Sequence, residues 1–301
     1  MELKDEIQQL KKDTDTVILA HYYVDGEVQD IADFVGDSYF LAKKAKEVTQ
    51  QNIVFCGVSF MGESAKLLNP TKNVYMPDAT ADCEMAHMVN LEDIDRVRQE
   101  HPDVAVVCYV NSTAEIKAKS DVCVTSSNAL RIVKALPNKD IFFIPDQNLA
   151  RYIADQLPEK NFIFNNGYCH VHHGIQVEEI KKAKEQYPDA LVLTHPECRK
   201  EVCDMSDFIG STSEIIDFAT ASDAKEFIVV TEIGVFHELK RRNPGKEFHQ
   251  VKVIQICPNM KKVSLKKVKD AMLGKCPEVV LSEDLMQLAN APLEKMIEIG
   301  K

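Results

Sequence analysis

Residues Val17–Lys46 read VILAHYYVDGEVQDIADFVGDSYFLAKKAK, and two later segments follow the same pattern. Aligned without gaps, they are AVVCYVNSTAEIKAKSDVCVTSSNALRIVK at Ala105–Lys134 and LVLTHPECRKEVCDMSDFIGSTSEIIDFAT at Leu191–Thr220, at offsets of 88 and then 86 residues. Each copy is followed by one cysteine at nearly the same place: Cys83, Cys169 and Cys257. Self-similarity at a fixed period is typical of repeat architectures. One soft ligand per copy therefore predicts a single site on a pseudo-threefold axis.

Short apolar runs alternate with helical patterns through every copy. The runs are VILA, IVFCGV and NVYM in the first copy, VAVVC, IFFI and NFIF in the second, and LVLT, FIVVT and VKVIQI in the third. Apolar runs of this length between helices indicate parallel βαβ units. We therefore expect an α/β protein of three αβα domains with parallel sheets, related by pseudo-threefold symmetry, with the active site at their common centre.

The repeat also predicts where the domains begin and end. We expect the three αβα units at residues 1–86, 87–172 and 173–260, followed by a helical tail at 261–301 that packs on the first unit. Domains of this size bury only a modest core by themselves, so they should pack tightly on one another.

The composition is that of a globular protein, with 45% hydrophobic residues in a chain of 301. No run approaches the roughly 18 apolar residues of a membrane span, and the opening MELKDEIQQLKKD is typical of a charged amphipathic helix and not of a signal peptide. We therefore expect a cytoplasmic protein without a membrane partner, whose nine cysteines form no disulfide framework. The net charge of −11 disfavours nucleic acid as a partner, although a local site can still bind a small anion.

The three repeated cysteines differ from the other thiols in their position. Each follows a third predicted strand in a loop, and such loops at strand ends hold the sites of open α/β sheets. Three equivalent thiolates can hold an iron–sulfur cluster with one open iron, as a Lewis-acid cluster requires. Two other interpretations stay open on spacing alone: small buried hydrophobic residues, or a Cys₃His zinc site. The histidines available to such a zinc site are His87, His170, His172 and His173.

A second column of the repeat consists of hydroxyl residues: Ser38, Ser126 and Thr212. Each precedes a helical pattern and is suited to cap that helix. Helix N-termini offer free N–H groups and a positive dipole end, so three of them together could bind a substrate with several anionic groups. The sequence contains neither GxGxxG nor GxxxxGK[ST], which leaves dinucleotide and P-loop functions without support.

Polar residues also gather at the ends of the first strands. They are His21, Tyr23, Tyr109, Asn111, His195 and Glu197. A carboxylate and an imidazole at one strand end, as in Glu197 and His195, make a candidate acid/base pair. The two tyrosines could pass protons or orient a carbonyl. His172, three residues after a candidate ligand, could bind substrate or support that ligand.

Several segments, taken in order, resemble the quinolinate synthase family, the iron–sulfur enzymes of NAD biosynthesis. These segments are HYYVDGEVQDIADFVGDS, YVNSTAEIKAKSDVCVTSSNA, GYCHVH, HPEC with the following GST, and CPNMKK. The resemblance implies three αβα domains and a central 4Fe–4S cluster held by one cysteine per domain. It also implies an enzyme of the transferase and dehydratase type, which condenses iminoaspartate with dihydroxyacetone phosphate to quinolinate and releases phosphate and water. An aspartate-oxidising enzyme would supply the iminoaspartate.

Carried over position by position, the resemblance assigns roles to individual residues. It implies that Cys83, Cys169 and Cys257 are the cluster ligands. The substrate-binding positions that it implies are His21, Ser38, Tyr109, Val110, Asn111, Ser126, His172, His195, Pro196, Glu197 and Thr212. The candidates for proton transfer are Glu197 with His195, and Tyr23 or Tyr109.

Two functions of other classes compete with this interpretation. A non-catalytic iron–sulfur sensor or cluster carrier would explain the cysteines, but it would not explain the polar residues at the strand ends. A zinc-stabilised protein that binds a polycarboxylate is a third hypothesis. Colour separates the cluster-binding hypotheses from the zinc hypothesis, because a cluster is brown and zinc is colourless.

Overall fold

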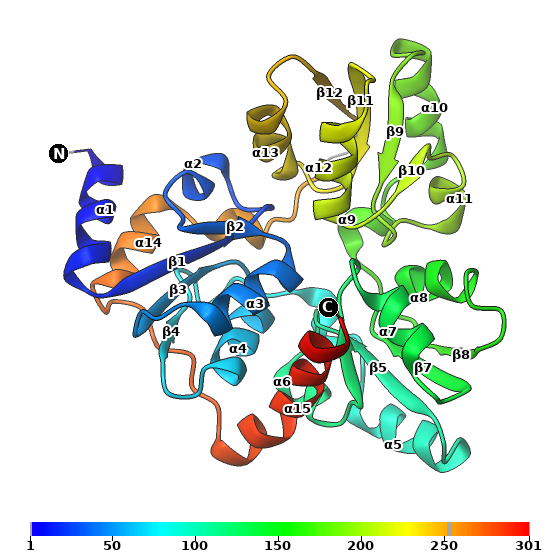
Figure 1. Cartoon of the computed structure of the whole chain (residues 1–301), viewed down its shortest axis with the longest axis horizontal. Coiled ribbons are helices and arrows are strands. Elements are labelled where there is room, and N and C mark those ends of the chain that lie inside the picture. Colours follow the sequence, from blue (N-terminus) through cyan, green and yellow to red (C-terminus); the bar gives the residue numbers. More distant parts are fainter. Residues whose placement is uncertain (1, 252–254, 301) are drawn as a thin grey trace.

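A computed structural model describes residues 2–251 and 255–300, which form three lobes around a common centre (Figure 1). Each lobe contains one four-stranded sheet, and all paired strands in these sheets are parallel. The α/β class with three parallel sheets is therefore confirmed.

The first lobe has the strand order β2-β1-β3-β4. Its elements are α1 (Leu3–Asp13), β1 (Thr16–His21), α2 (Gly26–Gln29), β2 (Phe34–Gly36), α3 (Ser38–Glu47), β3 (Asn52–Cys56), α4 (Ser59–Leu68), β4 (Asn73–Tyr75) and the 3-10 helix η1 (Glu84–His87). Every residue of β1 is buried, as expected for a parallel strand that is covered on both faces.

The second lobe repeats this arrangement in the order β6-β5-β7-β8. Its elements are α5 (Leu91–Glu100), β5 (Ala105–Tyr109), α6 (Ala114–Ala118), β6 (Val122–Val124), α7 (Ala129–Ala135), β7 (Asp140–Ile144), α8 (Gln147–Ala154) and β8 (Asn161–Phe164).

The third lobe has the order β10-β9-β11-β12. Its elements are α9 (His170–His173), α10 (Val177–Gln186), β9 (Leu191–Thr194), α11 (Lys200–Cys203), β10 (Phe208–Ile209), α12 (Thr212–Ala221), β11 (Glu226–Val230), α13 (Val235–Arg242) and β12 (Glu247–Gln250). In all three sheets the strand order reverses beside the first strand, and ligands bind at such switch points, outside the carboxyl ends of the strands.

Two features of the sheets differ from the sequence-based prediction. The edge strands β2, β6 and β10 were not predicted, because each is only two or three residues long. The last strand of the third lobe is β12, which precedes the predicted run VKVIQI. In that run Val251, Gln255 and Ile256 are not in a strand, and residues 252–254 lie outside the described residues. β12 has the sequence EFHQ, in which only Phe248 is buried, so this edge strand carries little apolar signal.

A threefold set of aspartates holds the edge strands in place. Asp33, Asp121 and Asp207 lie at the repeat offsets of 88 and 86 residues. Their carboxylates accept hydrogen bonds from the N–H groups of Ile18, Val106 and Val192 in the first strands, at 2.8, 2.7 and 2.7 Å. Their own N–H groups donate to the carbonyls of the same three residues, each at 2.9 Å. This column of the repeat is therefore structural.

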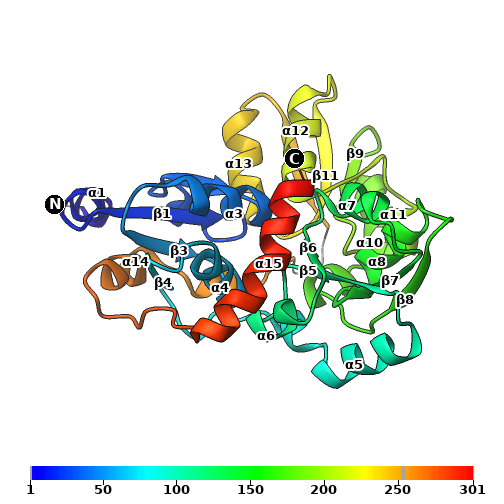
Figure 2. The ribbon, with the colours of Figure 1, turned by 60° about the horizontal axis from the view of Figure 1, so that its bottom comes forward.

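The tail contacts two lobes and not the first alone. Its helices are η2 (Met260–Lys262), α14 (Leu265–Met272) and α15 (Glu283–Ile299). α14 packs on α1 and β3 of the first lobe. α15 lies between α4 of the first lobe and α6 with β6 of the second (Figure 2). The buried residues of both lobes and of α15 consequently form one continuous core. The proposed domain boundaries stay a prediction.

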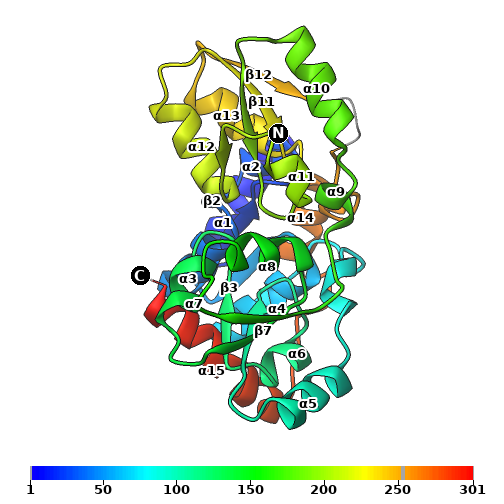
Figure 3. The ribbon, with the colours of Figure 1, turned by 90° about the vertical axis from the view of Figure 1, so that its right-hand side faces the viewer.

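α13 of the third lobe lies beside α2 of the first (Figure 3), and the backbones of the two lobes also come close together. A Cβ atom added at Gly234 would lie 2.6 Å from the carbonyl oxygen of Tyr22, so only glycine fits this position without a shift. The buried amide of Gln29 donates to the carbonyls of Tyr22 and Gly234 at 2.8 and 3.1 Å. These contacts bring the end of β1 to the edge of the third lobe.

Candidate active site

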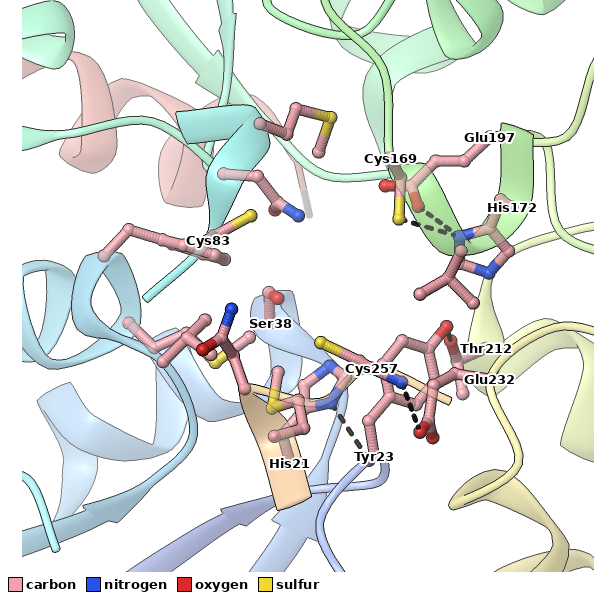
Figure 4. Close-up of a pocket in the computed structure, with 18 of the residues that line it drawn as sticks. His21, Tyr23, Ser38, Cys83, Cys169, His172, Glu197, Thr212, Glu232 and Cys257 are labelled. Carbon is pink, nitrogen blue, oxygen red and sulfur yellow. Dashed lines mark hydrogen bonds and ion pairs between the residues drawn. The ribbon is translucent and has the colours of Figure 1, made fainter. Parts of the chain in front are cut away.

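The three lobes enclose a cavity at the carboxyl ends of their strands, with about 800 Å³ of space including its mouth (Figure 4). Most of the predicted site residues line it. They are His21, Tyr23, Ser38, Cys83, Tyr109, Asn111, Ser126, Cys169, His172, His195, Glu197, Thr212 and Cys257. Val110 and Pro196 are buried beside this wall and do not line the cavity. Among the described residues, no lysine or arginine lines it either.

The three cysteines are presented by equivalent loops. In each lobe, a backbone N–H shortly after β3, β7 or β11 donates to the carbonyl two residues before the cysteine, at 2.8 Å. The donor and acceptor pairs are Ser59 to Ala81, Gln147 to Gly167, and Ile233 to Gln255. The sulfur atoms of Cys83, Cys169 and Cys257 point into the same central space (Figure 4). The structure therefore brings together the three thiols that the repeat placed in one column.

Burial keeps these thiols protonated in the metal-free protein. It raises the pKa of Cys83 to about 12, raises the pKa of Cys169 well above its usual value, and raises the pKa of Cys257. Binding a metal would therefore release protons, because thiolates and not thiols are the ligands.

Glu197 is a buried carboxylate in contact with two imidazoles. Its Oε2 lies 2.7 Å from Nδ1 of His172 and 3.8 Å from Nδ1 of His195. Burial alone would raise the pKa of Glu197, but the two imidazoles outweigh burial and lower the pKa to about 2. The predicted pair of Glu197 with His195 is thus extended by the closer partner His172, and the carboxylate is ionised at neutral pH.

A chain of hydrogen bonds connects this group with the first lobe. Nε2 of His172 lies 2.8 Å from the hydroxyl of Thr231, which lies 2.9 Å from the hydroxyl of Tyr23. The Tyr23 hydroxyl in turn lies 2.8 Å from that of Thr212. Sequence reasoning missed Thr231, although its place directly after β11 is a strand-end position of the kind that predicted the others. This connected path can move a proton between Tyr23 and His172.

His21 and His195 have matching hydrogen bonds at their strand ends. Nδ1 of His21 accepts the N–H of Tyr23 at 3.1 Å, and Nδ1 of His195 accepts the N–H of Glu197 at 3.3 Å. Burial lowers the pKa of each ring to about 3. Each ring is therefore neutral and carries its proton on Nε2. Both rings can donate a hydrogen bond from Nε2 without carrying a charge.

The predicted helix caps are displaced from the hydroxyl column. Asp37 caps α3 by accepting the N–H of Phe40 at 2.9 Å, and Ser211 caps α12 by accepting the N–H of Glu214 at 3.3 Å. Asn128 is the cap residue of α7. The prediction that Ser38, Ser126 and Thr212 cap these helices is therefore wrong. Asp37, Asn128 and Ser211 occupy the cap positions, so the hydroxyls of the predicted residues are not needed as caps. Ser38, Ser126 and Thr212 line the cavity wall instead.

Lowering the pH is expected to destabilise this fold through His21 and His195. A histidine in the unfolded chain titrates near 6.5, whereas burial lowers both folded pKa values to about 3, against a smaller opposing effect of Glu197. Between these values the unfolded chain binds protons that the folded chain does not. The free energy of unfolding therefore falls as the pH drops below about 6.5, by up to about 1.4 kcal/mol per pH unit for each ring.

Urea unfolding measured at a series of pH values tests this expectation. His21→Gln should reduce the slope of the free energy of unfolding against pH, whereas His101→Gln, at a side chain that is 41% exposed, should keep it. Equal slopes in the two variants would show that burial of His21 does not control the effect.

The fold and the site together define a three-lobed α/β enzyme with a central cavity that is lined by thiols and ionisable side chains. Residues 5–298 match the family described as "Quinolinate synthetase A protein". The chain is 49% identical to the quinolinate synthase of Caldicellulosiruptor saccharolyticus, over 99% of this chain and 98% of that protein. It is 50% identical to the quinolinate synthase of Fusobacterium nucleatum, over 99% of both chains, and 46% identical to that of Clostridioides difficile, over 100% of this chain and 99% of the other.

The chain belongs to the quinolinate synthase family, which confirms the resemblance found in the motifs. It is an enzyme of NAD biosynthesis that acts on small molecules, and the alternative of a non-catalytic sensor or cluster carrier is not favoured. Within residues 2–251 and 255–300, no helix combines the length and the apolar character that crossing a membrane requires.

Proposed function

We propose that this enzyme condenses iminoaspartate (iminosuccinate) with dihydroxyacetone phosphate to quinolinate, with loss of phosphate and water. We further propose that Cys83, Cys169 and Cys257 hold a 4Fe–4S cluster. One observation carries the proposal: three partly buried thiols, one from each lobe and on equivalent loops, point into a cavity that also contains acid/base and anion-binding groups.

The donor set fits a cluster with one open iron, because three thiols converge and the neighbouring imidazoles are engaged elsewhere. His172, the imidazole nearest to a cysteine, lies 3.3 Å from Sγ of Cys169, but Nδ1 also contacts Glu197 and Nε2 bonds Thr231. This arrangement does not favour the Cys₃His zinc site. When bound, such a cluster supplies a Lewis-acidic iron that polarises a substrate oxygen without a redox change.

The chain's own residues supply hydrogen-bond donors for two anionic substrates. Nε2–H of His21 and His195 and the hydroxyls of Ser38, Ser126 and Thr212 line the cavity. Ser38 and Thr212 are also the first residues of α3 and α12, whose N-termini favour phosphate and carboxylate groups. These donors would bind the phosphate and carboxylates with little help from formal positive charge.

Asn111 supports a nitrogen-containing substrate. Its Oδ1 is buried, lines the cavity with the rest of its side chain, and has no hydrogen-bond partner among the described residues. A buried acceptor without a partner is unfavourable, and the N–H of an imine or enamine would satisfy it. The side chain thereby selects a substrate that can donate at this position.

Proton transfer is assigned to the hydrogen-bonded path from Tyr23 through Thr231 to His172. The reaction must remove a proton from carbon and deliver protons to leaving oxygen atoms. With its pKa near 2, Glu197 is a weak base, and its role is to stabilise a proton on His172. Tyr109, whose pKa is raised by burial and by the charge of Glu197, stays protonated as a donor near the substrate.

The proposal also includes the source of one substrate and the compartment. Iminoaspartate would come from an aspartate-oxidising enzyme, and both enzymes would work in the cytoplasm. The net negative charge of the chain disfavours both nucleic acid and an anionic membrane as a partner.

An anaerobic assay tests the activity directly. Protein reconstituted with iron and sulfide should become brown and form quinolinate from iminoaspartate and dihydroxyacetone phosphate. Metal-free protein, and loaded protein without dihydroxyacetone phosphate, should form none. Loaded protein that forms no quinolinate from both substrates would contradict the proposed reaction.

A further inference from the structure

Each of the three cysteines donates its backbone N–H to a carboxylate. Cys169 donates to Oδ2 of Asp146 at 3.2 Å, and Cys257 donates to Oε1 of Glu232 at 3.1 Å. Cys83 donates to Oδ1 of Asp82, the residue before it, at 2.7 Å. The described structure thus gives every cysteine loop the same kind of hydrogen bond.

The carboxylates do not all come from the same place in the repeat. Asp146 and Glu232 are equivalent, at the offset of 86 residues, and follow β7 and β11, the third strands of their lobes. The equivalent residue of the first lobe is Val58, which is 2% exposed and cannot accept a hydrogen bond with its side chain. There the carboxylate comes from Asp82 instead. Because one contact is made from two different positions, repetition of the sequence alone does not explain it.

Each carboxylate is itself fixed by a second contact. Oδ1 of Asp146 accepts the N–H of Leu149 at 2.6 Å, at the start of α8. Oε2 of Glu232 accepts the N–H of Gly234 at 2.6 Å, and Nζ of Lys261 lies 3.1 Å from its Oε1. Both residues are 0% exposed. A buried carboxylate is tolerated where its oxygens are hydrogen-bonded, so each of these two ties a cysteine loop firmly to the start of the next helix.

Asp82 is held in a different way. It accepts the hydroxyl of Ser59, the first residue of α4, and lies 2.8 Å from Nε2 of His87 in η1. Its side chain is 47% exposed. The same bridge between a cysteine loop and a helix start is thus built at the surface in the first lobe and in the interior in the other two.

We propose that Asp82, Asp146 and Glu232 are positioning residues that hold the three cysteine loops so that their sulfur atoms converge before a metal binds. The inference rests on the proposed function, since the cluster is the group that these loops would receive. Partners that orient metal ligands in this way typically contribute about 10–100-fold in metal affinity. Loss of one carboxylate should therefore loosen one ligand and speed the release of iron.

Asp146→Asn is the most informative variant, because it keeps the size of the side chain and because Asp146 does not line the cavity. The amide keeps one oxygen and places an NH₂ group toward one of the two N–H donors. The matched control is Asp207→Asn, which makes the same change at a carboxylate that accepts the N–H of Val192 at 2.7 Å near the opposite ends of the strands. Glu232→Gln is the second variant, in case Asp146→Asn fails to fold.

Two measurements on the full-length protein decide the matter. In the reconstituted enzyme, the rate of iron transfer to a chelator should rise about tenfold or more in Asp146→Asn and remain unchanged in Asp207→Asn. In the metal-free protein, the affinity for Co²⁺, read from the cobalt–thiolate charge-transfer absorption, should fall by a similar factor in Asp146→Asn only.

The outcomes separate this inference from the proposed function. If wild-type protein holds the cluster and Asp146→Asn, or Glu232→Gln in its place, behaves as Asp207→Asn does in both measurements, the positioning role is wrong and the proposed function stands. If wild-type protein takes up no iron, the proposed function fails, and the inference fails with it.

Discussion

Cys83→Ala is expected to abolish cluster binding and quinolinate formation together. Each of the three equivalent loops contributes one thiol, and Cys83 is the thiol of the first lobe. The two thiols that remain cannot hold a cluster that needs three. Removing a small side chain at this loop leaves the hydrophobic core intact, so the variant should still fold. Iron and sulfide analysis, the visible absorption of the reconstituted protein and the anaerobic assay measure the result.

Cys276→Ala is the matched control for this variant. The Cys276 thiol is partly buried, donates to the carbonyl of Pro77 at 3.5 Å, and does not line the cavity. This control should keep both the cluster and the activity. A Cys83→Ala protein with the full wild-type cluster spectrum would show that the ligand assignment is wrong.

The interior strands could be predicted from the sequence, and so could two of the edge strands, β4 and β8, which correspond to the runs NVYM and NFIF. VILA, VAVVC and LVLT are buried on both faces except at Leu191, and such strands carry a continuous apolar signal. The other four edge strands lack this signal: β10 has two residues, and β12 has one buried side chain in four. Edge strands are specified by hydrogen bonds, including those of Asp33, Asp121 and Asp207, and a hydrophobic pattern does not report these bonds.

The site was predictable where the repeat placed polar residues in columns. The cysteines, His21, His195 and Glu197 occupy such columns, and the structure brings them to one cavity. Thr231 and Glu232 follow β11, where the three copies do not share one residue type: Gly57 and Pro145 are equivalent to Thr231, and Val58 and Asp146 are equivalent to Glu232. Their importance depends on contacts with residues distant in the sequence, Tyr23 for Thr231 and Cys257 for Glu232, which no local pattern encodes.

The helix caps were also predicted wrongly because a local pattern could not identify the right residue. Asp37 and Ser211 each precede a hydroxyl residue that is itself a good cap, so the sequence offers two adjacent candidates. Only the backbone path decides between them. The outcome matters for function, because a capping side chain is occupied by its own helix whereas Ser38 and Thr212 face the cavity.

Glu197→Gln is expected to keep the cluster and lose turnover. The side chain is 3% exposed, and its carboxylate lies 2.7 Å from Nδ1 of His172. Glutamine keeps the volume but removes the negative charge that stabilises a proton on His172. Groups that assist proton transfer typically contribute about 10²–10⁴-fold to the rate, so kcat should fall by a factor in that range. Anaerobic kinetics with both substrates measure it, alongside the absorption of the cluster.

Glu201→Gln supplies the comparison for this variant, since Glu201 is exposed on α11 and pairs with Arg199 at 3.3 Å, away from the cavity. This control should match wild type in kcat, KM and cluster content. The effects on kcat and on KM should differ. We assign phosphate binding to the helix starts, whereas Glu197 contacts His172. Loss of its charge should therefore lower kcat much more than it raises KM for dihydroxyacetone phosphate. A Glu197→Gln enzyme with unimpaired kcat would remove this carboxylate from proton transfer. An enzyme with unchanged kcat and a raised KM would instead place Glu197 among the groups that bind substrate.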